Sequence, residues 1–248
     1  MEFKTKKLSY AVGLEINSLD LNQDLSVETI AALKELWLKH QLLLFKNQNL
    51  LPLKLVKFLS HFEHLSIPSQ TKVNPKLHAT SFQFDNITSA GNWAAKLSFD
   101  KDLAAGFIFG CVEAPHLGCS SVFVNQAMAW ERLSPIYQVL IEGLQVVTTL
   151  QSLSLMHPIE MIHPATNQHA LFIHPDLQAK IENLHTIESQ TILKHLNRCQ
   201  SKMEYSYRHY WEKNDVVLWD NRNTLHTTVT DNRHAESVSM IGAALVNT

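Results

Sequence analysis

Histidine is the side chain that binds metal ions most often in proteins, and the sequence contains 14 of them in 248 residues. Four fall within a span of 18 residues, at His157, His163, His169 and His174. An alternative metal site for zinc or iron could be built from this group. The stronger interpretation is an ordinary one, because His157 and His163 each precede a proline and the other two fit surface positions.

Another histidine ends the segment at residues 219–226, which reads WDNRNTLH. A short apolar run at residues 216–219 leads into it and predicts a buried strand. Asp220 and Asn221 are expected to stabilise the turn that presents His226, because short polar side chains bond to nearby backbone groups. His226 is then either a pocket residue, as ligand or acid/base group, or a hydrogen-bonded core histidine, and both remain open.

These residues resemble the TauD/TfdA family of the iron(II)/2-oxoglutarate dioxygenase superfamily. Residues 219–226 resemble the family's WDNRxxxH signature, and residues 213–218 are similar to the strand before it. FKNQ at residues 45–48 and the flanks of the metal motif, at 91–93 and 97–99, are also similar to the family. So are the GGDT-like turn at 118–121 and the HP, HP and ALF elements within 157–173. The matches follow the family order through most of the chain, so it is identified as a member of this family.

The resemblance implies a fold that is mainly β with flanking helices, the double-stranded β-helix or jelly roll, with a ligand pocket between two antiparallel sheets. Working members hold iron(II) with an H-x-D pair and a distal histidine, which leaves three positions for 2-oxoglutarate and dioxygen. Residues 1–248 are expected to form a single domain of this kind. The polar segment 68–91, which has no clear period, is expected to be a loop that covers the pocket.

The sequence departs from the family at the metal motif. Where the family has W-H-x-D, this chain has Trp93-Ala94-Ala95-Lys96, so two of the three iron ligands are replaced. An inward, charged Lys96 would repel iron, because unit charges about 4 Å apart interact by roughly 4 kcal/mol at an effective dielectric of about 20. Lys96 could instead capture an anion or extend into solvent. His226 is left in the place of the distal ligand.

The arginine that would grip 2-oxoglutarate after the distal histidine is also missing. Residues 236–242 contain no cation, and Arg222 and Arg233 lie at other distances along the sequence from His226. Arginine suits this task because its guanidinium binds a carboxylate through two parallel hydrogen bonds.

From these departures we expect a TauD/TfdA-like protein with a degenerate iron and 2-oxoglutarate site. It is expected to bind a small anionic metabolite or a partner in the old active-site cavity without oxygenase chemistry. No metal and no cofactor is expected, with iron(II) and 2-oxoglutarate bound only if a non-standard site forms. The expected pocket residues are Trp93, Ala94, Lys96, Ser121 and His226.

Two alternatives stay open. One is an oxidoreductase, a dioxygenase or hydroxylase, whose metal is held by a non-standard set of residues. The other is a metal-independent enzyme in which His226 and Lys96 act as an acid/base pair.

Hydrophobic periodicity predicts the elements that must position these residues. Four helices are expected. The first covers residues 26–40 with Asp24 or Ser26 as its N-cap, and the second has Pro52 in its first turn. The other two cover residues 135–144 and 186–198. Strands are expected at residues 10–16, 41–45, 105–112, 121–124, 145–150, 170–173, 216–219 and 237–246.

The composition restricts the class of partner. A net charge of −2 with 18% charged residues provides no basic face for nucleic acid and no polybasic run for a membrane surface. No apolar stretch approaches the roughly 20 residues that span a bilayer. Three cysteines without CxxC spacing, and no signal-peptide pattern, favour a cytoplasmic protein. The sequence is compatible with a homo-oligomer.

Overall fold

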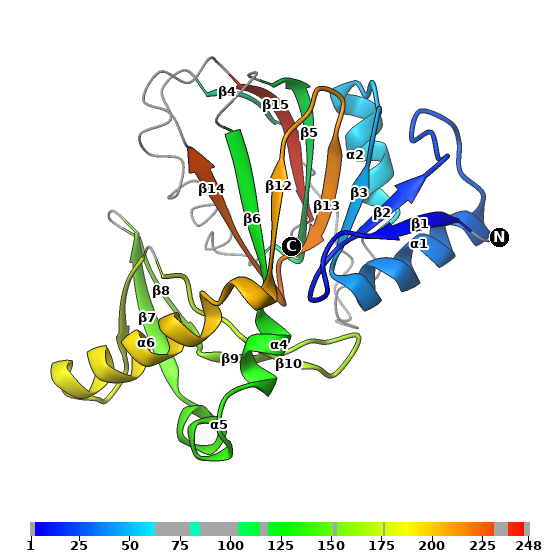
Figure 1. Ribbon diagram of the computed structural model, residues 1–248. Coiled ribbons are helices and arrows are strands. Elements are labelled where there is room, and N and C mark those ends of the chain that lie inside the picture. The colour runs from blue at the N-terminus through cyan, green and yellow to red at the C-terminus, as the bar shows by residue number, and fades with distance from the viewer. Residues whose placement is uncertain are drawn as a thin grey trace, which may run out of the picture.

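Figure 1 shows the computed structural model of the protein, which describes residues 3–62, 80–84, 104–114, 119–150, 153–175, 177–230 and 238–245. A pair of facing sheets forms the larger part, and a smaller unit of helices and short strands lies at one end of that pair. In the described ranges, no helix is long and apolar enough to cross a membrane.

The larger sheet has seven strands in the order β1-β2-β3-β13-β5-β15-β4. Their bounds are β1 (Lys4–Lys7), β2 (Leu14–Asn17), β3 (Leu42–Phe45), β13 (Val216–Asp220), β5 (Gly106–Glu113), β15 (Val238–Leu245) and β4 (Thr80–Phe84). All neighbours are antiparallel except β2 and β3, which are parallel. The sheet therefore joins segments from both ends of the chain.

Strand β3 explains why this sheet is buried on both faces. Side chains alternate along a strand, so Leu43 and Phe45 pack in one core with the helices, while Leu42 and Leu44 pack in a second core. All four side chains are at most 1% exposed. The continuous apolar run is therefore a strand covered on both faces.

The smaller sheet has the order β12-β6-β14, formed by β12 (Ser206–Tyr210), β6 (Cys119–Asn125) and β14 (Thr224–Thr230). It faces the larger sheet, and Phe123 of β6 contacts Trp219 of β13 with ring centroids 5.3 Å apart. Two facing sheets, antiparallel except for the β2–β3 pair, confirm the predicted jelly roll.

Two helices cover the outer face of the larger sheet (Figure 1). Helix α1 (Val27–His40) begins after Ser26, whose side chain accepts a hydrogen bond from the Thr29 N–H, as predicted for an N-cap. Helix α2 (Pro52–Ser60) has its proline in the first turn, where no backbone N–H is needed.

The smaller unit has its own core and interrupts the chain between β6 and β12. It contains α4 (Gln126–Glu131), α5 (Pro135–Ile141), β7 (Gln145–Leu150), β8 (Leu153–Pro158), β9 (Glu160–Ile162), β10 (His169–Leu171), β11 (Gln178–Ile181), α6 (Thr186–Gln200) and the 3-10 turn Met203–Tyr205. Its strands pair as β11-β7-β8 and β10-β9. Leu171, at the end of β10, and Ile173, just after it, are buried in this core.

The structure differs from the expected elements in several places. Residues 80–84, within the expected loop at 68–91, form strand β4 and pair with β15, and the rest of that segment lies outside the described residues. The sequence also did not predict the short strands β8, β9, β11 and β12, nor β14. Strand β14 contains four threonines, so the apolar alternation that marks a half-buried strand is weak.

Replacing Leu43 by alanine should destabilise the fold strongly. Leu43 is fully buried in β3, and such a truncation costs about 2–5 kcal/mol through lost burial and the cavity left behind. Chemical denaturation should show this loss, whereas Leu53→Ala, at a side chain that is 82% exposed, should change the unfolding free energy by less than about 0.5 kcal/mol. Equal effects of the two substitutions would contradict the burial described for β3.

Candidate functional site

His226 lies on β14 and faces the space between the two sheets. Its side chain is only 4% exposed, stacked on Phe123 at 4.8 Å and next to Trp219 at 4.7 Å between ring centroids. The aromatic contacts hold the imidazole plane in one orientation and keep water away from it.

A chain of two hydrogen bonds fixes one nitrogen of this imidazole. Trp211 Nε1–H donates to Ser121 Oγ over 3.0 Å, and Ser121 Oγ lies 3.0 Å from His226 Nε2. Because the indole can only donate, the Ser121 hydroxyl keeps its own proton available for Nε2. If Ser121 donates, His226 Nδ1 carries the proton; if Nε2–H donates, Nδ1 presents a lone pair. Within the described part of the chain, Nδ1 has no hydrogen-bond partner.

Burial, with a smaller contribution from the nearby His174, lowers the pKa of His226 to about 3. The imidazole is therefore neutral at physiological pH. A general base works best when its pKa lies near the working pH, so His226 is a weak base in this environment.

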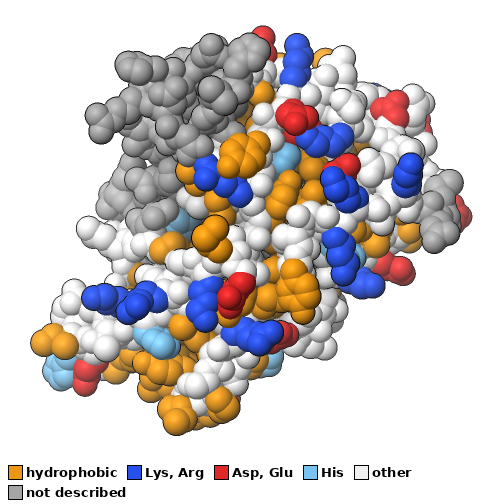
Figure 2. All heavy atoms as spheres, in the orientation of Figure 1, with side chains coloured by type: hydrophobic (Ala, Val, Ile, Leu, Met, Phe, Trp, Pro, Cys, Tyr) orange, Lys and Arg blue, Asp and Glu red, His pale blue; other side chains and the backbone are white. Residues whose placement is uncertain are grey.

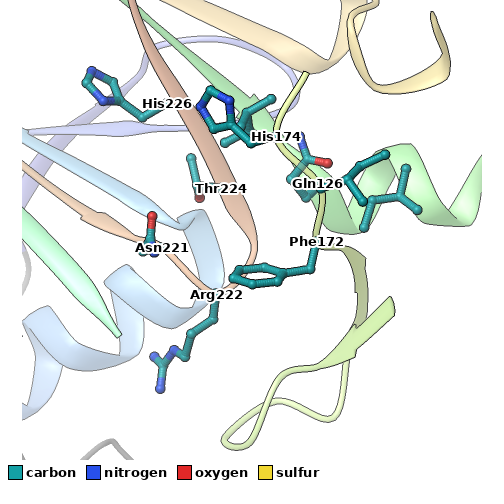
Figure 3. Close-up of a pocket in the computed structure, with 10 residues that line it drawn as sticks. Gln126, Phe172, His174, Asn221, Arg222, Thr224 and His226 are labelled. Carbon is teal, nitrogen blue, oxygen red and sulfur yellow. The ribbon is translucent and has the colours of Figure 1, made fainter. Parts of the chain in front are cut away.

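A small cavity lies beside these groups (Figure 3). It is lined by Gln126, Leu171, Phe172, Ile173, His174, Asn221, Arg222, Thr224, Leu225 and His226. Its volume of about 30 Å³ has room for one or two water molecules. Gln126 is 3% exposed, and neither atom of its side-chain amide has a hydrogen-bond partner among the described residues. Two residues of the cavity wall, His226 on β14 and Gln126 on α4, thus carry buried polar atoms without a hydrogen-bond partner among the described residues.

The turn before His226 is held by a buried carboxylate. Asp220 Oδ1 accepts from the backbone N–H and the Nε–H of Arg222, at 3.0 and 2.8 Å, and Asp220 Oδ2 accepts from His163 Nε2 at 3.0 Å. Burial alone would raise the pKa of Asp220, but the bonds from Arg222 and His163 outweigh it and hold the pKa below its usual value. Asp220 therefore stabilises the turn as expected, and it accepts hydrogen bonds from three donor groups of Arg222: the backbone N–H, Nε–H and Nη2–H.

The tautomer of His163 follows from its other contacts. Its Nδ1 accepts from the backbone N–H groups of Ala165 and Thr166, at 3.2 and 3.1 Å, so the proton must lie on Nε2, which donates to Asp220. His163 therefore has a structural role, which is to hold the Asp220 carboxylate and the turn before His226.

In the structure, the four histidines at positions 157–174 contact different residues. His157 bonds to Thr148, His163 to Asp220, and His169 to Glu160, while His174 lines the cavity with His226. No group of three or more potential metal ligands occurs among the described residues. The alternative metal site proposed for these histidines is therefore not formed there.

Of the expected pocket residues, Ser121 and His226 are brought together, whereas Trp93, Ala94 and Lys96 lie outside the described residues. Sequence reasoning missed Trp211 and Gln126. Trp211 directly follows β12, and a tryptophan beside a strand gave no reason to place its N–H on Ser121. No sequence signal marks Gln126.

The jelly roll, with the histidine of a WDNRxxxH segment facing between its sheets, defines a protein of the dioxygenase type. The family model "Taurine catabolism dioxygenase TauD, TfdA family" matches residues 4–242, and the chain belongs to this family.

Curated relatives agree with that assignment. The α-ketoglutarate-dependent sulfonate dioxygenase of Saccharomyces cerevisiae is 28% identical over 94% of this chain, which spans 66% of the yeast protein. The α-ketoglutarate-dependent sulfate ester dioxygenase of Pseudomonas putida is 23% identical over 93% of this chain and 85% of its own length.

Solved structures support the fold. A taurine dioxygenase from Burkholderia xenovorans aligns with a TM-score of 0.82 at 24% identity, covering 100% of this chain and 90% of that one. AAD-2, in complex with Mn(II) and N-oxalylglycine, aligns with a TM-score of 0.82 at 18% identity, covering 100% and 98%.

The expectation that no metal and no cofactor is involved is wrong, because these comparisons contradict it. The relatives depend on α-ketoglutarate, which is 2-oxoglutarate, and the family therefore points to that co-substrate with a divalent metal. The described residues alone do not complete such a site, because they gather no set of three ligands. His226 Nδ1, in the tautomer that presents a lone pair, is one nitrogen that could contribute.

The ring signals of His226 should stay constant between about pH 8 and pH 4. Its pKa of about 3 keeps the folded protein from binding a proton that the unfolded chain binds below about pH 6.5. This histidine therefore lowers stability as the pH falls from about 6.5 towards 3. Two-dimensional NMR of ¹⁵N-histidine-labelled protein, assigned with His226→Gln, measures the titration. A midpoint near pH 6.5 would contradict the buried neutral imidazole.

Asp220→Asn should destabilise the protein by about 3–5 kcal/mol, because it leaves the buried Arg222 guanidinium without its carboxylate. Thermal or urea unfolding provides the measurement. Asp24→Asn is the matched control, since Asp24 pairs with Lys57 in solvent and its loss should leave the unfolding midpoint unchanged. Similar midpoints for the two variants would rule out a scaffold role for Asp220.

Proposed function

We propose that the protein binds a small organic anion in the cavity beside His226. The observation that carries the proposal is the buried Nδ1 of His226, which has no hydrogen-bond partner in the described part of the chain. When Ser121 donates to Nε2, Nδ1–H is a donor held ready for a ligand oxygen. The unsatisfied Gln126 amide adds a second donor on the same cavity.

The relatives support an anion rather than a neutral ligand. Their names specify sulfonates, sulfate esters and 2,4-dichlorophenoxyacetate, all of which are organic molecules with a negatively charged oxygen group. A neutral N–H can bind such a group, because hydrogen bonds to an ionised acceptor are about twice as strong as neutral ones. The volume of about 30 Å³ restricts what enters to a small head group unless wall side chains move.

Oxygenase chemistry with a non-standard metal site is the second candidate. The other tautomer of His226, with Nε2–H donating to Ser121, leaves a lone pair on Nδ1, and His174 lines the same cavity as His226. Iron(II) with 2-oxoglutarate would activate dioxygen, which is the oxidant in this chemistry, and Ser121 would keep the ring oriented. The metal-independent acid/base alternative has less support, because a pKa of about 3 leaves His226 unprotonated near neutral pH.

Anion binding is tested by thermal shift and calorimetry with methanesulfonate, methyl sulfate and acetate. At least one should stabilise the full chain, and His226→Gln should remove the effect. His157→Gln is the matched control, because it replaces a buried histidine that lines a different part of the fold. Lys96→Ala tests the expectation that Lys96 captures the anion. If none of the three anions binds, or if His226→Gln binds them as well as the unaltered chain, the proposal is wrong.

The second candidate is separated from the first by anaerobic addition of iron(II) and 2-oxoglutarate. Binding of both should produce a visible charge-transfer band that His226→Gln abolishes and His157→Gln preserves. A band that persists in His226→Gln would place the metal elsewhere. No band, with anion binding intact, would leave binding as the supported function.

A further inference from the structure

A second hollow lies on the smaller unit, between α6 and the segment that leads into β11. Its volume is about 580 Å³, compared with about 30 Å³ for the cavity at His226. Sites for small organic molecules usually measure about 300–1,000 Å³. The groove can therefore hold a whole organic ligand as it stands, whereas the cavity at His226 has room only for a small head group unless wall side chains move.

The groove combines an apolar floor with a positive rim. Its lining residues are Ile173, His174, Leu177, Ala179, Gln190, Leu193, Lys194, Asn197, Arg198 and Ser201. Lys194 and Arg198 are four positions apart on α6, so their side chains project from the same face of the helix. Among the described residues, no carboxylate lines the groove and neither cation forms an ion pair. Figure 2 shows Lys and Arg side chains over α6 with hydrophobic side chains beside them.

We propose that this groove is a binding site for an amphipathic organic anion, with its aryl or alkyl body on the apolar floor and its sulfonate, sulfate or carboxylate group at Lys194 and Arg198. Arginine can bind such a group through two parallel hydrogen bonds, and lysine adds a second positive charge. Neutral donors from Gln190 and Asn197 complete the polar side of the groove, while the Ser201 hydroxyl already donates to the Asn197 carbonyl oxygen.

The groove touches the inner cavity through one short segment. Ile173 and His174 line both hollows, so a ligand in the groove lies against the wall of the His226 cavity. The proposal nevertheless rests on the residues of the groove alone. It stands or falls independently of anion binding at His226.

The test is a fluorescence titration of the full chain with 8-anilino-1-naphthalenesulfonate, an aryl sulfonate that brightens in apolar sites. Lys194→Gln/Arg198→Gln should weaken its binding at least about fivefold, since two exposed charge contacts contribute about 1 kcal/mol together. The control Lys6→Gln/Lys39→Gln removes the same number of positive charges from exposed positions on β1 and α1, and should bind as the unaltered chain does. Circular dichroism and thermal melting verify that both variants are folded.

Two further measurements identify the site and the ligand class. Naphthalene-2-sulfonate should displace the probe, whereas uncharged 2-naphthol should not. His226→Gln should leave the affinity for the probe unchanged, which separates the groove from the His226 cavity. The proposal is overturned if the groove variant binds as tightly as its charge-matched control, if 2-naphthol competes equally, or if His226→Gln alone abolishes binding.

Discussion

The carboxylate of Asp220 connects the parts of this protein. It ends β13 of the larger sheet, accepts hydrogen bonds from Arg222 in the turn, and accepts another from His163 in the smaller unit. The Arg222 guanidinium lies 5.5 Å from the ring of Trp37 in α1, which brings the outer helix into the same assembly. Because a charge is costly to bury unless it is paired, removing any one partner would disturb all of these contacts. The position of His226, four residues after Arg222, depends on this arrangement.

The chemistry available to His226 depends on the position of a single proton. Trp211 fills one acceptor site of Ser121, and Ser121 then either donates to His226 Nε2 or accepts from it. The first arrangement makes Nδ1–H a hydrogen-bond donor, and the second leaves a lone pair on Nδ1 that can bind a metal. The same side chains can therefore serve anion binding or a metal site, and the low pKa of the imidazole removes proton exchange from its roles near neutral pH.

Size and charge separate the two hollows of the molecule. The cavity at His226 is narrow, and its polar atoms are neutral or, like Arg222, already bonded to a carboxylate. The groove on α6 is wide, apolar at its base and positively charged at its rim. Electrostatic attraction acts over about 10 Å at moderate salt, so the exposed cations of the groove can concentrate organic anions near the wall that the hollows share.

By itself, the sequence determined the family, the jelly roll and a helix over residues 26–40, because these rest on local patterns and an ordered signature, whereas the structure decided between Asp24 and Ser26 as its N-cap. The sequence also determined that residues 93–96 lack a histidine and a carboxylate, although its inference that no cofactor is involved was wrong. Only the tertiary structure decided that Trp211 and Ser121 fix His226, since those bonds join residues 90 and 105 positions apart. It likewise decided that Gln126 lines the cavity and that Lys194 and Arg198 face an apolar floor. Contacts of this kind depend on how strands and helices pack together. The hydrophobic periodicity of a single segment does not predict that packing.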